Sequence, residues 1–295
     1  MPRIALIGPG AIGGLTAAWL CQDQENDVTV CARTPLRNLR LETPDGPVDA
    51  HPAVLTEPEP GPAADWILVA TKAYDSDSAA AWFATLLGDD TRVAVLQNGV
   101  DHVERFSKYL PAERIVPVIV DCPTERVEPG RIRQRGPVTM VVPASSIGTA
   151  YTDLFARTAV EASTSENFTT MAWRKLCINA AGAVNALTLE PAGIANNAQA
   201  ALVMHNLVFE AAAVGRAEGA DLDDSIAAEV IDIYRNQPKD SVNSLLADRL
   251  AGRPMEIDLR NGVIVRLGQR HRIATPCNEM AVALLEAVAP QQGAE

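Results

Sequence analysis

Lys175 and Asn179 are polar residues whose spacing predicts a shared face on one helix. They belong to the segment Trp173-Arg-Lys-Leu-Cys-Ile-Asn179, and residues four apart are neighbours on a helix surface. An ammonium group at this position could donate a proton to the oxygen of a carbonyl group that is being reduced, which is general acid catalysis. The alternative is a solvated lysine on an amphipathic helix, which is the commoner role for such a lysine taken by itself.

Lys72 and Asn98 each follow an apolar run that predicts a buried strand. Lys72 comes directly after Trp66-Ile-Leu-Val-Ala-Thr71, and Asn98 follows Val93-Ala-Val-Leu-Gln97. Ligands of open α/β sheets bind at the carboxyl ends of parallel strands, so the two residues would bring a cation and an amide to that edge. Asn98-Gly99 is also a common dipeptide of left-handed turns, and this alternative stays open.

Ser244 and Glu256 are further candidates in the C-terminal half of the chain. Ser244 precedes an apolar helical run, where its hydroxyl group could either cap the helix or bind a ligand. Glu256 stands near a predicted helix start, where the helix dipole favours a carboxylate even without a function. The residues alone do not decide between these alternatives.

A glycine-rich segment at the N-terminus predicts a loop that binds a dinucleotide. The apolar run Ile4–Ile7 leads directly into Gly8-Pro-Gly10-Ala-Ile-Gly13. In this pattern Gly8 permits a tight turn, Gly10 lets a phosphate approach the backbone, and Gly13 allows the next helix to pack on the sheet. An ordinary structural turn is the alternative, but the strand before the glycines favours the binding loop.

The helix after the glycines and the strand that follows it complete the predicted nucleotide site. We expect the helix over residues 11–21, where Ala11 and Ile12 would direct backbone N–H groups at the pyrophosphate. The strand at 27–33 follows at the distance of a βαβ unit. It ends in Arg33 rather than an acidic residue, and a guanidinium can pair with the 2′-phosphate of NADP. We therefore expect NADPH rather than NADH, with a solvated Arg33 as the alternative.

Composition agrees with a two-domain enzyme and argues against several other classes of protein. The chain has 295 residues and a net charge of −12, and its pI of about 4.8 disfavours binding to nucleic acid or to an anionic membrane. No apolar run approaches the ~20 residues of a membrane span, so we expect a cytoplasmic protein. The five cysteines and four histidines have no spacing typical of a metal site, and no metal is expected.

The order of the predicted elements indicates an α/β fold with two domains. Strands and helices alternate up to about residue 164, which is typical of a Rossmann domain with a mostly parallel sheet, and helical patterns dominate afterwards. We expect an NADP-binding Rossmann domain over 1–164 and an all-helical substrate domain over 165–295, with the substrate in the cleft between them. Strands are expected at 4–7, 28–32, 66–70, 93–96 and 115–120, and helices at 11–21, 76–87, 101–109, 169–187, 197–218, 224–235, 242–251, 257–269 and 277–288.

One antiparallel strand pair is also expected at the edge of the sheet. The segment Arg131–Val142 shows apolar and polar residues in alternation on both sides of Gly136-Pro137. Alternation on either side of a turn dipeptide is typical of a hairpin, so we expect Gly136-Pro137 at its turn.

Together the motifs resemble those of the 2-dehydropantoate 2-reductase, or ketopantoate reductase, family. The resemblance implies NADPH-dependent reduction of 2-dehydropantoate to pantoate, on the pathway to pantothenate and coenzyme A. It covers both halves of the chain and is more specific than any single motif. The matching pieces are Gly8–Gly13, Arg33, Thr71-Lys-Ala-Tyr-Asp75, Gln97-Asn-Gly99, Trp173–Asn179, Ser244–Asp248, Glu256-Ile-Asp258, Asn261-Gly262 and Thr275-Pro276.

The resemblance also implies roles for single residues. Lys175 would be the general acid, and Glu256 would help to place the lysine and the cofactor. Arg33 would bind the 2′-phosphate, and Lys72 would lie beside the cofactor. The implied cofactor-binding residues are Gly8, Gly10, Ala11, Ile12, Gly13, Arg33, Lys72, Asn98 and Glu256, and the implied substrate-binding residues are Asn98, Lys175, Asn179 and Ser244.

The chain departs from the family pattern at residue 183. The family usually has a second asparagine four residues after the first, but this chain has Ala183 there, and its next asparagine is Asn185. In a regular helix Asn185 would lie about 120° from Asn179, on another face. Either a local bulge at Gly182 restores the contact, or the contact is lost and a different 2-oxo acid becomes an alternative substrate.

Two alternatives to ketopantoate reduction therefore remain at this point. The protein could reduce another small 2-oxo acid with NADPH, or it could be a sensor that binds NADP without catalysis. The expected partner is a small 2-oxo acid rather than a nucleic acid or a membrane. The sequence does not set the oligomeric state, and a homodimer is the assembly to test.

Overall fold

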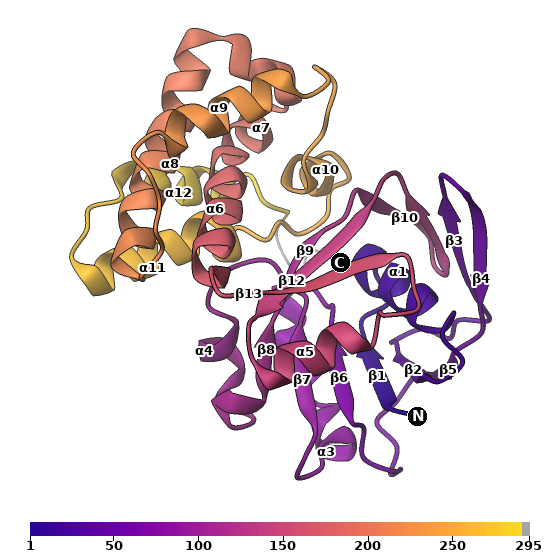
Figure 1. The fold of residues 1–295 in the computed structure, drawn as a ribbon. Helices are drawn as coiled ribbons and strands as arrows, with labels where there is room; N and C mark the ends of the chain where they lie inside the picture. Colours follow the sequence, from indigo (N-terminus) through magenta and orange to yellow (C-terminus); the bar gives the residue numbers. More distant parts are fainter. Residues whose placement is uncertain (291–295) are drawn as a thin grey trace. The chain divides into compact units, whose positions relative to one another are not determined.

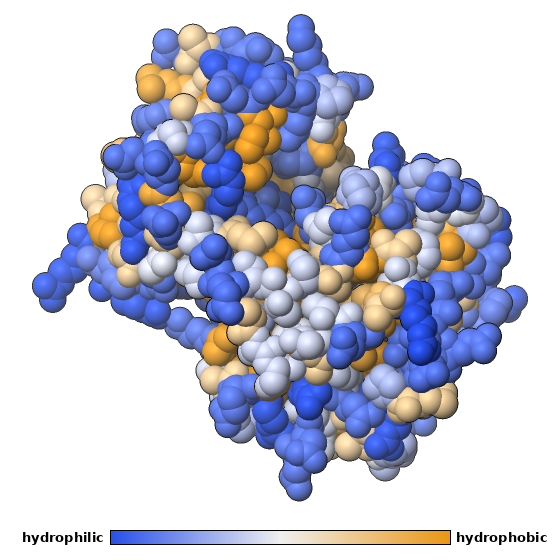
Figure 2. All heavy atoms as spheres, in the orientation of Figure 1, coloured by the Kyte–Doolittle hydropathy of each residue, from blue (hydrophilic) through white to orange (hydrophobic). Residues whose placement is uncertain are grey.

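The computed structural model describes residues 1–290, which form two compact units. The first unit runs from Met1 to Phe168, and the second begins at Thr169. The sequence places the boundary at 164/165, close to this division. Hydrophilic side chains cover most of the face drawn in Figure 2, as expected for a chain of this net charge.

The first unit is built on a parallel sheet of six strands (Figure 1). Every neighbouring pair in this sheet is parallel, which confirms the expected Rossmann arrangement. The strand order is β5-β2-β1-β6-β7-β8. The strands are β1 (Arg3–Ile7), β2 (Asp27–Cys31), β5 (Ala53–Leu55), β6 (Trp66–Val69), β7 (Arg92–Val95) and β8 (Ile115–Pro117).

Alternate residues of the central strands pack on opposite faces of this sheet. Ile4 and Leu6 of β1 belong to one buried cluster, whereas Ala5 and Ile7 belong to another. A strand that is buried on both faces reads as a continuous apolar run, which explains the run at 4–7. Helix α1 (Ala11–Leu20) contributes to the first cluster, and α2 (Ser76–Ala80), α3 (Phe83–Leu86) and α4 (His102–Phe106) contribute to the second.

The expected helix over 76–87 is interrupted. A 3₁₀ turn, η1 (Ala73–Asp75), precedes α2, and residues Ala81 and Trp82 separate α2 from α3. The expected helix over 101–109 is also shorter, because α4 ends at Phe106.

The expected hairpin around Gly136-Pro137 is wrong. The two flanking strands, β11 (Arg131–Gln134) and β12 (Val138–Pro143), belong to different sheets. The hairpin turn lies earlier, at Gly130, whose φ of 80° suits a glycine. It joins β11 to β10 (Thr124–Glu128), and β11 also pairs with β3. Both segments are strands, as the alternation predicts, but alternation does not identify the partner of each strand.

Two smaller sheets complete the first unit. One has the order β10-β11-β3-β4, with β3 (Leu39–Thr43) and β4 (Gly46–Ala50), and α1 packs against these strands as well. The other has the order β13-β12-β9, with β9 (Ile119–Asp121), β13 (Val160–Ser165) and helix α5 (Ser146–Asp153) beside it. The expected strand over 115–120 is therefore divided between β8 and β9, which lie in different sheets.

The second unit is helical, as expected. Its elements are α6 (Phe168–Ala181), α7 (Ala183–Thr188), η3 (Ala192–Asn196), α8 (Ala198–Ala217), α9 (Ile226–Asn236), α10 (Ser244–Leu250), η4 (Asp258–Gly262), α11 (Val263–His271) and α12 (Pro276–Ala287). Two expected helices are modified: the helix over 169–187 breaks at Gly182, and the helix over 257–269 begins with a turn of π-helix, η4.

Helix α8 is, by length and composition only, apolar enough to cross a membrane, and it is the one such helix among residues 1–290. Half of its apolar window is buried inside the structure. Its Glu210 accepts hydrogen bonds from the backbone N–H groups of Cys277 and Asn278, at 2.8 and 2.9 Å. A carboxylate that caps α12 in this way indicates a core helix of the second unit.

Candidate active site

The backbone and the packing of the glycine loop agree with those of a phosphate-binding loop. Gly8 has a φ of 89°, a conformation that side chains other than glycine rarely adopt. A Cβ atom on Gly13 would overlap the carbonyl oxygen of Gly8 and lie 3.0 Å from the Cβ atom of Ala70. A Cβ atom on Gly10, by contrast, would meet nothing within 4 Å. The loop is therefore tightly packed at Gly8 and Gly13 and open at Gly10.

Helix α1 begins directly after this open position. Gly10 is its N-cap residue, and no side chain caps the first turn, which starts with Ala11 and Ile12. An uncapped helix N-terminus beside open space fits an anionic group, since the helix dipole and backbone N–H groups both favour it. The residues of this loop thus fit a dinucleotide.

Arg33 lies just beyond the end of β2 and is largely exposed. Its side chain is 83% exposed, and its guanidinium lies 3.4 Å from the carboxylate of Asp75. The sequence shows no acidic residue between Val28 and Arg40, so this partner comes from a distant segment, the 3₁₀ turn η1. An exposed arginine can bind a phosphate, and Asp75 would compete with that phosphate for the guanidinium.

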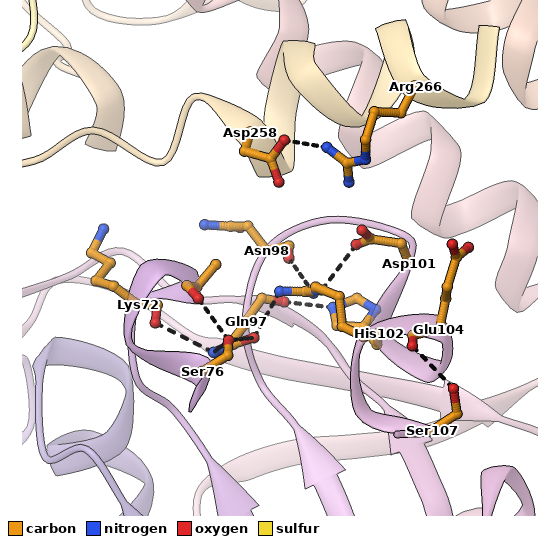
Figure 3. A network of polar contacts seen from close by, with 12 residues as sticks. Lys72, Ser76, Gln97, Asn98, Asp101, His102, Glu104, Ser107, Asp258 and Arg266 are labelled. Carbon is orange, nitrogen blue, oxygen red and sulfur yellow. Dashed lines mark hydrogen bonds and ion pairs between the residues drawn. The ribbon is translucent and has the colours of Figure 1, made fainter. Parts of the chain in front are cut away.

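Lys72 and Asn98 follow β6 and β7, as the sequence predicts, and Gln97 joins their two loops. The Gln97 side-chain amide donates to the hydroxyl oxygens of Thr71 and Ser76, at 3.1 Å each, and lies 3.5 Å from the carbonyl oxygen of Lys72. In Figure 3 the side chains of Lys72 and Asn98 both extend away from this network. The structure therefore fixes the two backbones together at the edge of the sheet.

Arg105 fixes the loop that contains Gln97 and Asn98. Its guanidinium donates to the Gln97 side-chain oxygen at 2.8 Å and to the Asn98 carbonyl oxygen at 3.2 Å. It also forms an ion pair with Asp101 at 3.0 Å. The sequence analysis missed Gln97 and Arg105 as functional candidates, because their role depends on contacts that spacing does not reveal.

Lys175 and Asn179 share one half-buried face of α6, as their spacing predicts. Trp173, Leu176 and Cys177 are buried on the other side of the helix. The helix is fixed in place by α9, since the Tyr234 hydroxyl group donates to the carbonyl oxygen of Ile178 at 3.0 Å. The helix thus packs through its buried side, and Lys175 and Asn179 lie on the other side.

The break at Gly182 does not return Asn185 to that face. Asn185 is 1% exposed, and its amide donates to the carbonyl oxygen of Glu190 at 3.0 Å. Its side-chain oxygen accepts a hydrogen bond from Asn243 at 3.2 Å. Asn185 thus connects α7 to α10, and Ala183 is buried. Of the two alternatives that the sequence leaves open, the structure supports the loss of the second asparagine contact.

Ser244 is the first residue of α10, but it is not the cap of this helix. The N-cap residue is Asn243, whose side chain accepts a hydrogen bond from the backbone N–H of Leu246 at 2.9 Å. The Ser244 hydroxyl oxygen instead accepts a hydrogen bond from Arg260 at 2.6 Å. Arg260 lies in η4, and its guanidinium also donates to the carbonyl oxygen of Asn179 at 3.4 Å. Two predicted site residues, Asn179 and Ser244, are therefore joined through Arg260.

Glu256 is buried, at 7% exposed, and lies two residues before η4. Its negative charge acts on the guanidinium of Arg260, so it lies in the same part of the second unit as Asn179 and Ser244. The next carboxylate, Asp258, forms an ion pair with Arg266 (Figure 3). Among residues 1–290 no group of histidine, cysteine, aspartate and glutamate side chains could hold a metal ion.

Comparison with known proteins identifies the family. Residues 4–146 match the family "Ketopantoate reductase PanE/ApbA", and residues 167–289 match "Ketopantoate reductase PanE/ApbA C terminal". A 2-dehydropantoate 2-reductase from Caulobacter vibrioides is 55% identical over 289 residues, which covers 98% of this chain and 100% of the relative. The chain belongs to the ketopantoate reductase family.

Solved structures agree with the fold of this family. A crystal structure of a PanE/ApbA family ketopantoate reductase from Ralstonia eutropha JMP134 is 31% identical, with a TM-score of 0.87 over 97% of this chain and 98% of that one. D-mandelate dehydrogenase with NADH and anilino(oxo)acetate has a TM-score of 0.87 over 97% of each chain at 22% identity. The latter likeness shows the fold alone, so the fold does not by itself select one 2-oxo acid.

Proposed function

We propose that this protein reduces 2-dehydropantoate to pantoate with NADPH, as a step toward pantothenate and coenzyme A. The observation that carries the proposal is the 55% identity to a 2-dehydropantoate 2-reductase over the full length of that relative. The two alternatives from the sequence, a different 2-oxo acid and a sensor without catalysis, are not favoured by this likeness.

NADPH is the source of the hydride that the carbonyl carbon receives. The open backbone at Gly10 and the uncapped start of α1 would bind the pyrophosphate, and exposed Arg33 would bind the 2′-phosphate. Lys72 and Asn98, held by Gln97, would complete the cofactor site at the edge of the sheet. Gly8, Gly13, Ala11 and Ile12 shape this site through the backbone.

Lys175 would supply the proton that the developing alkoxide needs. Asn179, one helical turn later on the same face of α6, would hydrogen-bond the 2-oxo acid, and Ser244 would do so from α10. Asn98 would contribute a third contact to the substrate, through its side-chain amide. Buried Glu256 would position Lys175 and the cofactor, as the family resemblance implies.

The remaining expectations concern the whole protein. We place the nucleotide-binding domain at 1–164 and the substrate domain at 165–295, and the division of the structure after Phe168 supports this. We also expect cytoplasmic localisation. A ketopantoate reductase of this fold from Staphylococcus aureus is described as dimeric, and light scattering on the purified chain would test whether this protein forms a homodimer.

A panel of small 2-oxo acids tests the proposed function. Each acid is supplied with NADPH and, separately, with NADH, and the initial loss of nicotinamide absorbance is measured. We expect 2-dehydropantoate with NADPH to give the highest kcat/KM. A different acid with a kcat/KM more than tenfold higher would replace the substrate in this proposal, and NADPH binding without turnover of any acid would support the sensor.

A further inference from the structure

Arg260 is a buried cation whose hydrogen-bond acceptors are both uncharged. It is 3% exposed and lies in the π-turn η4, where the backbone N–H of Gly262 bonds to the carbonyl oxygen of Ile257, five residues earlier. Its acceptors are the Ser244 hydroxyl oxygen and the Asn179 carbonyl oxygen. Its Nε–H group is buried and has no hydrogen-bond partner among residues 1–290. Single π-turns occur frequently at functional sites.

Burying a guanidinium costs free energy unless hydrogen bonds and opposite charges compensate for the lost hydration. Burial lowers the pKa of Arg260, and nearby groups, led by Glu256, oppose that shift. Arginine nevertheless remains protonated in proteins, so a full positive charge stays in this part of the helical unit. An unsatisfied buried donor on a charged group carries a desolvation penalty, and a bound anion would offset it.

The bond to Ser244 determines the direction of the serine proton. A serine hydroxyl group has one O–H donor and two lone pairs. Because one lone pair accepts the Arg260 bond, the O–H must point away from the guanidinium. Ser244 is exposed, and no described residue accepts its proton. The hydroxyl is therefore held as a donor that faces outward, with a cation behind it.

Helix α10 is held firmly enough for this arrangement to last. Asn243 donates to the carbonyl oxygen of Gly182 at 3.3 Å and to the side-chain oxygen of Asn185 at 3.2 Å. At the other end of the helix, Arg249 donates to the carbonyl oxygens of Ala186 and Leu187. The start of α10 is thus fixed on α7, and Ser244 is fixed with it.

We propose that Arg260 is a positioning residue that holds Ser244 as a donor and supplies the positive charge by which the helical unit selects a carboxylate substrate. This rests on the proposed function and narrows it to the anionic form of the 2-oxo acid. Asn185, the next asparagine after Asn179, is bonded to Glu190 and Asn243 instead.

The test compares an acid with its neutral analogue. Arg260→Met removes the charge at similar volume, and Arg260→Lys keeps it. Kinetics are measured with 2-dehydropantoate and with the primary amide of the same 2-oxo compound. Because a hydrogen bond to a charged group contributes more than a neutral one, we expect Arg260→Met to raise KM for the acid about 10- to 100-fold. The amide should change by less than about threefold, and Arg260→Lys should restore part of the preference for the acid.

Three controls separate positioning from folding. Arg235→Met removes a partly exposed arginine of α9 that bonds to the carbonyl oxygen of Ala195, and it should leave the acid-to-amide ratio unchanged. NADPH affinity should stay the same in every variant, because the glycine loop lies in the other unit. In the double variant Arg260→Met with Ser244→Ala, KM for the acid should be no higher than in the more impaired of the two single variants, since Arg260 acts through Ser244.

Equal losses for the acid and the amide would overturn the proposal, as would losses in the double variant that multiply. If the parent chain turns over no 2-oxo acid, the proposed function fails, but Arg260 is still tested by calorimetry. The parent should then bind the 2-dehydropantoate anion more tightly than the amide, and Arg260→Met should abolish the difference. Equal binding of the two compounds by the parent would contradict the role of Arg260.

Discussion

We expect the charges of Arg33 and Asp75 to determine the preference for NADPH over NADH. A guanidinium can bind the 2′-phosphate of NADPH through two hydrogen bonds, and NADH has no such phosphate. We therefore predict that Arg33→Ala raises KM for NADPH at least tenfold more than KM for NADH. Asp75→Asn serves as the matched variant: it removes the carboxylate that lies 3.4 Å from the guanidinium, and it should lower KM for NADPH. An equal change for the two cofactors in Arg33→Ala would show that Arg33 has another role.

Asn179 and Asn185 should respond differently to the same substitution. Asn179 shares the Lys175 face, whereas Asn185 is buried and bonded to Glu190 and Asn243. We predict that Asn179→Ala raises KM for the 2-oxo acid about tenfold or more with little change in the melting temperature. Asn185→Ala should mainly lower the free energy of unfolding, by about 1–3 kcal/mol, because it removes the bond to the Glu190 carbonyl oxygen and one of the two bonds of the Asn243 amide. Equal kinetic losses would place Asn185 in the substrate site.

The residues that the sequence identified and those that it missed differ in how far apart along the chain their contacts lie. Lys175 and Asn179 are four residues apart on one helix, so their shared face follows from helical geometry. Arg260 contacts Ser244 and Asn179 from distant positions in the chain. Nothing in spacing or composition predicts such contacts, because they depend on how separate helices pack.

At the scale of elements, Gly182 is required by close packing rather than by flexibility. An added Cβ atom there would lie 2.8 Å from the amide nitrogen of Asn243 and 2.9 Å from the hydroxyl oxygen of Tyr234. Alanine ordinarily stabilises a helix relative to glycine by about 0.5–1 kcal/mol. Here we predict that Gly182→Ala lowers the free energy of unfolding by about 1–3 kcal/mol, through overpacking. Denaturant unfolding measures this.

The same substitution in a Tyr234→Phe background provides the control. That change removes the hydroxyl oxygen that the new Cβ atom would meet, so part of the clash is relieved. Gly182→Ala should then destabilise the chain less than it does in the parent. If Gly182→Ala stabilises the parent, the close approach at this helix break is not a constraint.

Glu42 joins β3 to β11, and this contact makes one part of the stability depend on pH. Hydrogen bonds from Arg131, and to a smaller extent from Arg133, hold the pKa of Glu42 below its usual 4.5. A lowered pKa means that the stabilisation is complete above the unfolded-state value and disappears as the pH falls through the folded-state value. We predict that Glu42→Gln lowers the melting temperature at pH about 7 and that the difference shrinks as the pH falls below about 4.5. A difference that is constant with pH would assign the effect to shape rather than charge.

Strands β1, β2, β6 and β7 of the parallel sheet were predicted closely, β8 was expected only as part of a longer strand, and β5 was missed. In the smaller sheets β3, β4, β10 and β13 were missed. Strands β1, β6 and β7 are buried on both faces, so they read as apolar runs in the sequence. Strands β3, β4 and β10 have mixed burial and carry many polar residues, and no apolar run marks them. The error at Gly136-Pro137 has the same cause, since strand pairing is decided by partners far apart in the chain.

In the whole molecule, the residues proposed for the cofactor and those proposed for the substrate come mainly from different units. The first unit contains the glycine loop, Arg33, Lys72 and Asn98, and the second contains Lys175, Asn179, Ser244 and Glu256. A substitution in one unit should therefore leave the intrinsic task of the other unchanged. A variant that lacks only the general acid should therefore still bind the cofactor but should turn over little substrate.

The rate at which the Lys175→Ala variant reduces 2-dehydropantoate, at saturating NADPH, shows whether Lys175 is the general acid. General acid catalysis typically contributes about 10²- to 10⁴-fold, so we predict a fall in kcat within that range. NADPH affinity, measured by fluorescence, should stay within about threefold, and Lys175→Arg should restore little, because a guanidinium hardly releases its proton near neutral pH. An alanine variant that reduces 2-dehydropantoate at the parent rate would show that Lys175 is not the general acid.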